Sequence, residues 1–195
     1  MTTIADGRRT NTRDQLVEAA VSLFRRQGVS GTGLDEICRR AGVTKGVFAY
    51  HFPGGKRELL TAAVEQNASD VRALLARLAQ RSDGSAPDLV RTLFATYGRL
   101  FRKHGWAFGC PVAAAVVEAR EDEEIVVGAA FASWRAALRD MDVRFEAGVD
   151  ALVVAAFEGA ILQARADRNA DVFDQIGESL AHLIETASPR QELSA

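Results

Sequence analysis

The chain has 195 residues, 48% of them apolar and 26% charged, a composition that allows a sizeable core and excludes a wholly disordered protein. Its longest uncharged stretch, Gly105–Val117, has 13 residues, which is shorter than the roughly 18 that a membrane-spanning helix needs. The net charge of −2 hides an asymmetry: residues 1–60 carry a net +4 and residues 61–195 a net −6, so only the first third is suited to approach a polyanion.

The N-terminal segment and the cysteines indicate the compartment. The stretch Met1–Asp14 is polar and lacks the apolar segment of a secretory signal. The two cysteines, Cys38 and Cys110, form neither a disulfide framework nor the spacing of a zinc site. We therefore expect a cytoplasmic protein with reduced thiols, no membrane partner, no metal and no cofactor.

Apolar residues recur with the period of an amphipathic helix along most of the chain, and no convincing strand alternation is visible. This pattern predicts an all-α fold of about nine helices. The glycines and prolines between the periodic segments supply the breaks, and Asp150 is expected to cap the eighth helix. The expected helices are 11–27, 34–41, 45–50, 56–80, 88–103, 111–119, 121–147, 151–166 and 171–186.

The segment 33–52, GLDEICRRAGVTKGVFAYHF, has the parts of a helix-turn-helix, because two short amphipathic helices are joined by a tight turn that contains Gly42. Apolar side chains of this segment can pack on the helix 11–27 and hold the second short helix at the surface, where its outer face fits a DNA major groove. The polar side chains available for DNA are Thr44, Lys45, Tyr50, His51, Lys56 and Arg57.

Within the chain, 13–60 resembles the DNA-binding domain of TetR-family transcriptional regulators. The resemblance is carried by LVEAAVSLFRRQG, by LDEICRRAGVTKG, and by YHF followed by Lys56-x-x-Leu59. The runs YHFPGGKREL and GCPVAAAVVEA, the latter at 109–119, look like the LmrA/YxaF-type subgroup. The resemblance implies an N-terminal helix-turn-helix DNA-binding domain over 8–60, with its motif at 33–52, and a C-terminal effector-binding and dimerisation bundle over 61–188.

The resemblance also implies roles for individual residues. Thr44 matches the residue that caps the recognition helix and touches a phosphate, and Lys45 and Gly46 match positions that face base edges. Tyr50 and His51 match the end of the recognition helix, where they would contact the DNA backbone. The lysine on a phosphate at the start of the next helix is matched by Lys56.

Three positions expected at the DNA depart from the family pattern. Gly33 stands where a Ser or Thr cap is usual, and Thr32 is the substitute for that phosphate contact. Val47 and Ala49 stand where the family has Thr and Tyr, so one base-reading hydroxyl and one phosphate contact are missing. No relative's operator sequence can therefore be carried over to this chain.

Plainer alternatives stay open for several of these residues. Tyr50 could simply pack, and Lys56 and Arg57 could be solvated charges. Cys38 fits a small core residue of the helix-turn-helix. A basic cluster could form an arm near the minor groove or a disordered tail; it consists of Arg8, Arg9 and Arg13.

The acidic remainder of the chain contains clustered aromatic residues, which fit either a plain packed core or an apolar ligand pocket. The family resemblance favours a pocket for a flat, largely apolar small-molecule effector. Its expected lining is Phe94, Tyr97, Phe101, Trp106, Phe108, Trp134 and Phe157, with Glu118 and Gln163 as polar contacts.

The last two helices are candidates for a dimer interface. One carries a ridge of small residues and the other an apolar stripe, and in the family such helices pair with those of a second subunit; packing within one chain is the alternative. A homodimer also suits a palindromic operator, which requires two recognition helices about 34–36 Å apart. The expected interface residues are Ala155, Ala156, Gly159, Ala160, Val172, Phe173, Ile176, Leu180 and Leu183.

Together these features predict a DNA-binding transcriptional regulator, a repressor released from double-stranded operator DNA when an effector moves the helix 56–80. An activator of the same architecture, a non-specific DNA-compacting protein and a small-molecule-processing enzyme are the alternatives. The chain has no G-x-S-x-G, no phosphate loop and no base evident for Cys110, so we expect no catalytic residues.

Overall fold

The computed structural model describes residues 11–118, 121–141 and 146–187, and in these ranges it contains nine helices and no strand. The predicted all-α fold is confirmed. The helices are α1 (Thr12–Gln27), α2 (Leu34–Ala41), α3 (Lys45–His51), α4 (Lys56–Ala79), α5 (Ala86–His104), α6 (Pro111–Glu118), α7 (Glu121–Arg139), α8 (Val149–Asp167) and α9 (Asp171–Ala187).

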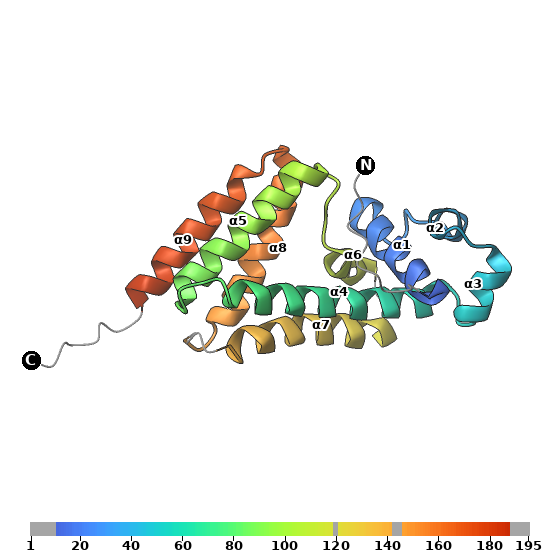
Figure 1. The fold of residues 1–195 in the computed structure, drawn as a ribbon, viewed down its shortest axis with the longest axis horizontal. Coiled ribbons are helices and arrows are strands. Elements are labelled where there is room, and N and C mark those ends of the chain that lie inside the picture. Colours follow the sequence, from blue (N-terminus) through green and yellow to red (C-terminus); the bar gives the residue numbers. More distant parts are fainter. Residues whose placement is uncertain (1–10, 119–120, 142–145, 188–195) are drawn as a thin grey trace, which may run out of the picture.

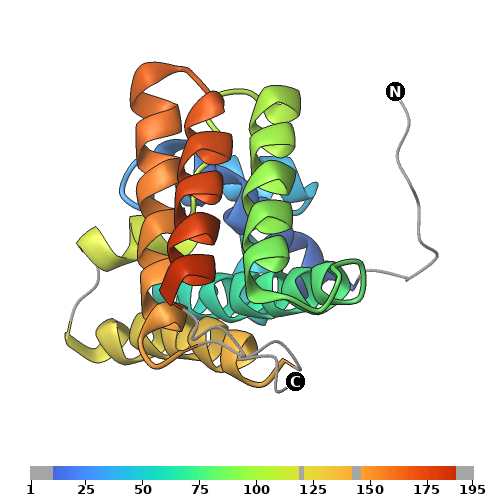
Figure 2. The ribbon, with the colours of Figure 1, turned by 90° about the vertical axis from the view of Figure 1, so that its left-hand side faces the viewer.

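The long helix α4 runs through the middle of the molecule, with the three short N-terminal helices at one end of it (Figure 1). Helix α7 lies along α4, whereas α5, α8 and α9 stand side by side across its other end (Figures 1 and 2). The short helix α6 lies between these two parts and packs on both α1 and α4. Helix α4 therefore belongs both to the N-terminal head, formed with α1, α2 and α3, and to the body formed by the remaining helices.

Helix α1 shows how the local sequence sets an element. The Asn11 side chain accepts hydrogen bonds from the N–H groups of Arg13 and Asp14, which satisfies donors that the first turn leaves unpaired. Gly28 ends the helix with a φ of 78°, in the region that favours glycine. The stripe of Leu16, Ala20, Leu23 and Phe24 is buried as its spacing predicts.

The core has two clusters that meet at the middle of α4. The first joins the head to the beginning of α4, α6 and α7, and the second joins the end of α4 to α5, α8 and α9. Val71, Cys110 and Val154 pack against both. The expected boundary between residues 60 and 61 falls inside the continuous helix α4. Leu60 and Ala63, on either side of that boundary, belong to the same core cluster.

Most helix boundaries lie within two residues of those expected, and the start of α5 and the end of α7 show why boundaries shift. Helix α5 begins at Ala86 because the Ser85 hydroxyl accepts from the N–H of Asp88, and Pro87 is tolerated in a first turn. Helix α7 ends at Arg139, well before the expected 147, although 142–145 lie outside the described residues.

Asp150 is not the cap of α8. The cap position is Gly148, in a left-handed conformation, and Asp150 lies in the first turn with only 5% of its surface exposed. Its carboxylate forms an ion pair with Arg139, which fastens the end of α7 to the start of α8. The Asp150 side chain, which the sequence spacing assigned to capping α8, instead forms a tertiary ion pair.

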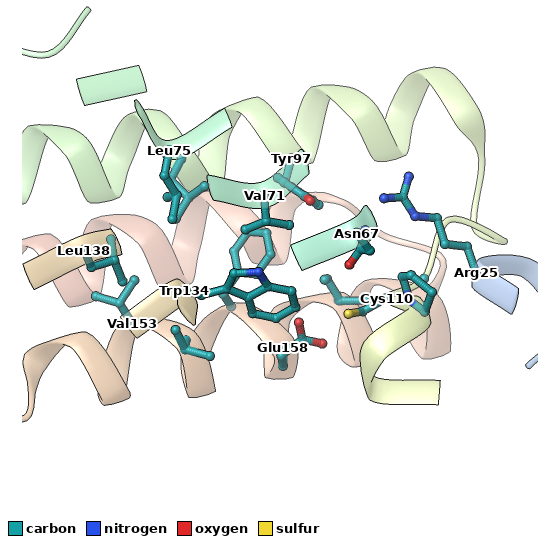
Figure 3. A pocket seen from close by; sticks show the side chains of 16 residues that line it. Arg25, Asn67, Val71, Leu75, Tyr97, Cys110, Trp134, Leu138, Val153 and Glu158 are labelled. Carbon is teal, nitrogen blue, oxygen red and sulfur yellow. The ribbon is translucent and has the colours of Figure 1, made fainter. Parts of the chain in front are cut away.

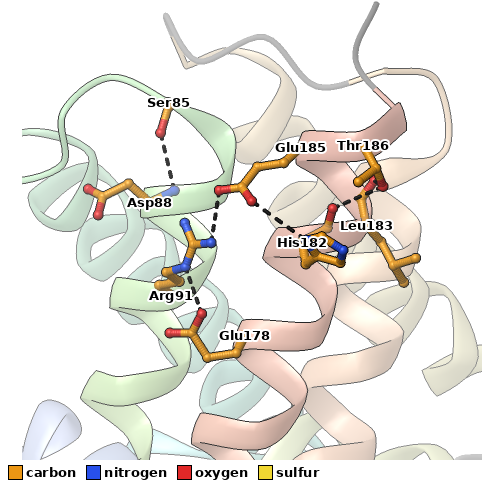
Figure 4. Close-up of polar contacts among 8 residues, drawn as sticks. All are labelled: Ser85, Asp88, Arg91, Glu178, His182, Leu183, Glu185 and Thr186. Carbon is orange, nitrogen blue, oxygen red and sulfur yellow. Dashed lines mark hydrogen bonds and ion pairs between the residues drawn. The ribbon is translucent and has the colours of Figure 1, made fainter.

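Helices α5 and α9 form the most extensive helix pair, and charged side chains align along their border. The Arg91 guanidinium contacts Glu178 at 2.9 Å and Glu185 at 2.8 Å (Figure 4). Arg102 contacts Asp171 and Asp174 at 3.0 and 2.9 Å. These acids of α9 are thus engaged within the subunit.

Among the described residues, no helix has both the length and the apolar character needed to cross a membrane.

Candidate DNA interface and ligand cavity

The helix-turn-helix is built as its sequence predicts. Gly42 makes the turn after α2 in a left-handed conformation, with a φ of 71°. The Thr44 hydroxyl caps α3 by accepting from the N–H of Val47 at 3.4 Å. Phe48, the buried side chain of α3, is 5% exposed and stacks on Phe52 with ring centroids 5.7 Å apart. Phe48 therefore anchors α3 to the core on one side, and the opposite side of α3 faces outward.

The outward side of α3 is open. Tyr50 is 82% exposed and meets the ring of His51 edge-on, with 5.1 Å between centroids, so packing into the core does not account for it. Lys45, Gly46 and Val47 are exposed as well, and an added Cβ at Gly46 would meet only Thr44 Oγ1, at 3.9 Å. This face has the shape and the small residue that close approach to base edges requires.

Lys45 is paired with an acid of the preceding helix. Its Nζ lies 2.6 Å from Asp35 Oδ1, and the two side chains are 72% and 69% exposed. The hydrogen bond to Asp35 raises the pKa of Lys45, which stays a cation. Exposed ion pairs of this kind are weak, so Lys45 can exchange Asp35 for a group on DNA.

Two residues assigned to phosphate contacts are engaged inside the head. Thr32 is 1% exposed and donates to the carbonyl of Gly28 at 2.7 Å, because the end of α1 leaves carbonyl groups unpaired. Lys56 donates to the carbonyl of Val29 at 2.6 Å. Both fasten the α1–α2 connection, and a buried Thr32 cannot reach a phosphate. Gly33 is exposed at the cap of α2, without a side-chain hydrogen bond.

Of the expected basic arm, Arg8 and Arg9 lie outside the described residues. Arg13 belongs to the first turn of α1, where its guanidinium lies 5.0 Å from the centroid of the Phe52 ring. Cys38 is 4% exposed in the head core, as expected for a structural thiol.

A cavity lies in the body between α4, α5, α7 and α8, with α1 and α6 at one end (Figure 3). The cavity is nearly filled by its own side chains, and its free volume is about 30 Å³. The walls are mostly apolar. The lining residues are Arg25, Asn67, Val71, Leu75, Leu93, Tyr97, Gly109, Cys110, Pro111, Trp134, Leu138, Val153, Val154, Phe157, Glu158 and Ile161.

Polar groups gather at one end of this cavity (Figure 3). Asn67 is 1% exposed and its Oδ1 has no hydrogen-bond partner among the described residues; the same holds for the buried atoms Glu158 Oε2 and Arg25 Nε. Burial raises the pKa of Glu158 to about 7, although a hydrogen bond from the Cys110 thiol opposes the shift. Burial also raises the pKa of Cys110 well above its usual value, so this thiol stays protonated.

The aromatic residues expected at a pocket divide into two groups. Tyr97, Trp134 and Phe157 line the cavity. Phe94 and Phe101 do not, because both are fully buried in the second core cluster, around Phe157 and Phe173 respectively.

The remaining expected contacts also lie elsewhere. Trp106 is 37% exposed. Phe108 stacks on His104, and the guanidinium carbon of Arg25 lies 4.9 Å from the centroid of the Phe108 ring. Glu118 accepts a hydrogen bond from the Ser30 hydroxyl. Gln163 is exposed on α8.

Arg25, Asn67 and Glu158 were missed as lining residues, although two of them carry a signal in the sequence. Asn67 interrupts the apolar stripe of α4, and Glu158 is the only acid of α8 between its first turn and its last residue. A polar residue at a core position of a helix is unusual unless it has a partner or a ligand.

The expected dimer residues also divide. Ala160, Phe173 and Leu180 are buried within the subunit, because α9 packs on α5 and α8. Four others are half-buried, and they are Ala156, Gly159, Val172 and Ile176. Ala155 and Leu183 are exposed. Two leucines of α8 that the spacing did not single out, Leu152 and Leu162, are exposed as well.

The end of α1 is held by residues of the body. Arg165 of α8 donates to the carbonyls of Arg25 and Arg26 at 3.2 and 3.3 Å. The N–H of Gly109 also donates to Arg25, at 3.1 Å, and a Cβ at this glycine would lie 2.7 Å from that same carbonyl oxygen. Arg25, whose side chain lines the cavity, thus has its backbone clamped by α8 and by the segment before α6.

Known proteins match most of this chain. Residues 16–63 match the model of the bacterial regulatory proteins of the tetR family, and residues 86–179 match that of the C-terminal domain of LmrA/YxaF-like transcriptional regulators. An uncharacterised HTH-type transcriptional regulator of Mycobacterium tuberculosis H37Rv is 27% identical over 195 residues, which cover 92% of this chain and 97% of that protein. The HTH-type regulator LmrA of Bacillus subtilis is 41% identical over 66 residues, 34% of this chain and 35% of LmrA.

Solved structures agree in fold. Reduced Escherichia coli NemR superposes with a TM-score of 0.77 at 23% identity, covering 92% of this chain and 98% of NemR. The regulatory protein TetR from Rhodobacter sphaeroides gives 0.75 at 21% identity, covering 88% of this chain and 97% of that protein.

Proposed function

The chain belongs to the TetR family of bacterial transcriptional regulators and is a DNA-binding regulator, and from this premise we propose that it is a homodimeric repressor released from a palindromic operator by a small-molecule effector. The observation that carries the proposal is the position of Arg25: it belongs to α1 of the head, yet it lines the cavity of the body. We assign DNA binding to residues 8–60 and effector binding and dimerisation to residues 61–188, in the cytoplasm.

The DNA contacts come from the outward side of α3. Lys45 and Gly46 face base edges, while Thr44, Tyr50 and His51 contact the sugar–phosphate backbone. The N-terminus of α2 at Gly33 has no side-chain cap, so its backbone N–H groups suit a phosphate. Lys56 acts indirectly, because its hydrogen bond to Val29 fixes the start of α4 against the head.

The second subunit covers an uncharged surface of α8 and α9. Leu152, Ala155, Gly159 and Leu162 fall on one side of α8 at helical spacing. Leu183 is 58% exposed on α9, on the opposite side from the acids that pair with α5. Exposed apolar side chains next to small residues favour close helix packing between subunits, and family members dimerise.

Effector binding must enlarge the cavity, because its present free space is far below that of a drug-sized ligand. The walls that would move include α4 at Asn67 and α1 at Arg25, both continuous with the DNA-binding head. The ligand-free form is then the operator-binding form. A coupling of about 1–3 kcal/mol would lower operator affinity roughly 5- to 150-fold.

Selection of bound sites from random DNA duplexes tests this function. The selected sequence is expected to be palindromic, and its affinity should exceed that of random duplexes at every salt concentration. Equal affinity for all sequences would contradict the proposal. In an in vitro transcription assay with the selected site at a promoter, a repressor lowers transcript yield, whereas an increase would mark an activator.

A further inference from the structure

The polar end of the cavity presents hydrogen-bond acceptors that lack donors. Asn67 Oδ1 and Glu158 Oε2 are both buried and both without a partner among the described residues. They come from α4 and α8 and point toward the same end of the cavity (Figure 3). Buried acceptors are normally paired, so a ligand that donates several hydrogen bonds fits this end.

One acidic and one basic side chain line the cavity, Glu158 from α8 and Arg25 from α1. Glu158 is the only carboxylate of the lining, and the described residues give it no ion-pair partner. The other titratable groups around it are the protonated thiol of Cys110, the hydroxyl of Tyr97 and the guanidinium of Arg25. The guanidinium of Arg25 lies 4.9 Å from the centroid of the Phe108 ring and also borders an open hollow that contains Glu18 and Asp70.

The walls next to the carboxylate are aromatic. Trp134 is 4% exposed and its ring is fixed by a hydrogen bond from Nε1 to the carbonyl of Ala68, at 3.3 Å. Tyr97 and Phe157 meet edge-to-face with 4.3 Å between centroids. Aromatic rings beside a buried carboxylate are a setting that attracts organic cations, through the ring faces and through the charge.

Building on the proposed effector role, we propose that this cavity binds an aromatic organic cation, whose ammonium group donates to Glu158 and Asn67 and whose rings lie among Trp134, Tyr97 and Phe157. Burial disfavours the charged form of Glu158 and raises its pKa. An ammonium group restores the ionised form on binding. A carboxylate placed beside Glu158 and Asn67 would instead meet a like charge and an amide oxygen.

Three probes that share one ring system test the charge preference: 2-naphthylmethylamine, 2-naphthylmethanol and 2-naphthoate. Calorimetric titration at about pH 8, above the pKa of about 7 for Glu158, should show the amine binding about tenfold or more tightly than the naphthoate, with the alcohol between them. Equal affinities, tightest binding of the naphthoate or no binding of any probe would each overturn the proposal.

The variant Glu158→Gln keeps the shape and removes the charge. It should bind the amine no better than the alcohol, while the control Asp167→Asn, an exposed acid on the same helix, keeps the preference. If Glu158→Gln does not fold, the unaltered protein still decides: its amine affinity should fall as the pH drops through about 7, where Glu158 becomes protonated. An amine affinity that stays constant over that range would contradict the assignment.

The two proposals fail separately. Operator affinity is measured by fluorescence anisotropy with and without saturating 2-naphthylmethylamine. If the amine binds through Glu158 and operator affinity is unchanged, the cation site stands and the effector role is refuted. If another compound releases the operator but the amine shows no preference over the naphthoate, the regulatory function stands and the cation site is refuted.

Discussion

Arg165→Met removes the polar contact that fastens α8 to the end of α1. Arg165 donates to two carbonyls of the last turn of α1, at 3.2 and 3.3 Å, and Met preserves much of the apolar stem. A hydrogen bond from a charged donor contributes about 1.5–3 kcal/mol, but these two are long and partly solvated. We assign about 1 kcal/mol to each, so the free energy of unfolding should fall by about 2 kcal/mol.

The same substitution should weaken communication between the cavity and DNA. A clamp of about 2 kcal/mol corresponds to a factor of about 30 in an equilibrium constant. The loss of operator affinity caused by a saturating effector should therefore shrink by up to that factor. Ligand affinity should change little, because Arg165 does not line the cavity.

Urea unfolding at fixed protein concentration measures the first effect, and anisotropy of labelled operator with and without ligand measures the second. Arg77→Met, at an exposed arginine of α4, is the matched control and should leave both unchanged. Wild-type stability together with a wild-type ratio of operator affinities in Arg165→Met would refute the clamp and leave α4 as the connection.

Four further substitutions test other parts of the account. Lys45→Ala should weaken binding to the selected operator roughly 5- to 150-fold and to random DNA much less; an equal loss on all duplexes would make Lys45 a phosphate contact. Asp35→Asn should strengthen binding to any duplex, because it releases Lys45 and removes a carboxylate near DNA. Leu162→Glu, at a side chain 63% exposed on α8, should yield a monomer by light scattering, whereas Val117→Glu, at a residue 87% exposed on α6, should remain a dimer; a dimeric Leu162→Glu would exclude this surface. For Glu158, whose pKa rises from 4.5 to about 7 on folding, the folded protein retains a proton that the unfolded chain releases. Stability should therefore fall as the pH rises from about 4.5 to about 7, and Glu158→Gln should remove that slope in urea titrations.

Local signals predicted most of the helices. Gly28, Gly42 and Thr44 act within about one helical turn of where they stand, so their roles as breaks and caps follow from the chain alone. The side chain of Asp150 could not be assigned in this way, because its ion pair with Arg139 depends on how α7 and α8 meet. Tertiary contacts overrode spacing at that position.

The outward face of the recognition helix was predicted better than the cavity. Phe48 had to be buried for α3 to be held, and the remaining polar residues of the helix then faced outward. For the aromatic residues, helical spacing does not distinguish a cavity wall such as Trp134 from a packed core residue such as Phe101. The polar positions Asn67 and Glu158 were better indicators than the aromatic ones, since each interrupts an apolar helix surface.

Hydroxyl-radical footprinting of the protein on its selected operator tests the central claim most directly. The account predicts a dimer that protects the sugar–phosphate backbone on either side of two symmetric major-groove segments about 34–36 Å apart, one for each α3, and loss of both when Leu162→Glu separates the subunits. One protected segment, or uniform protection along the duplex, would contradict it.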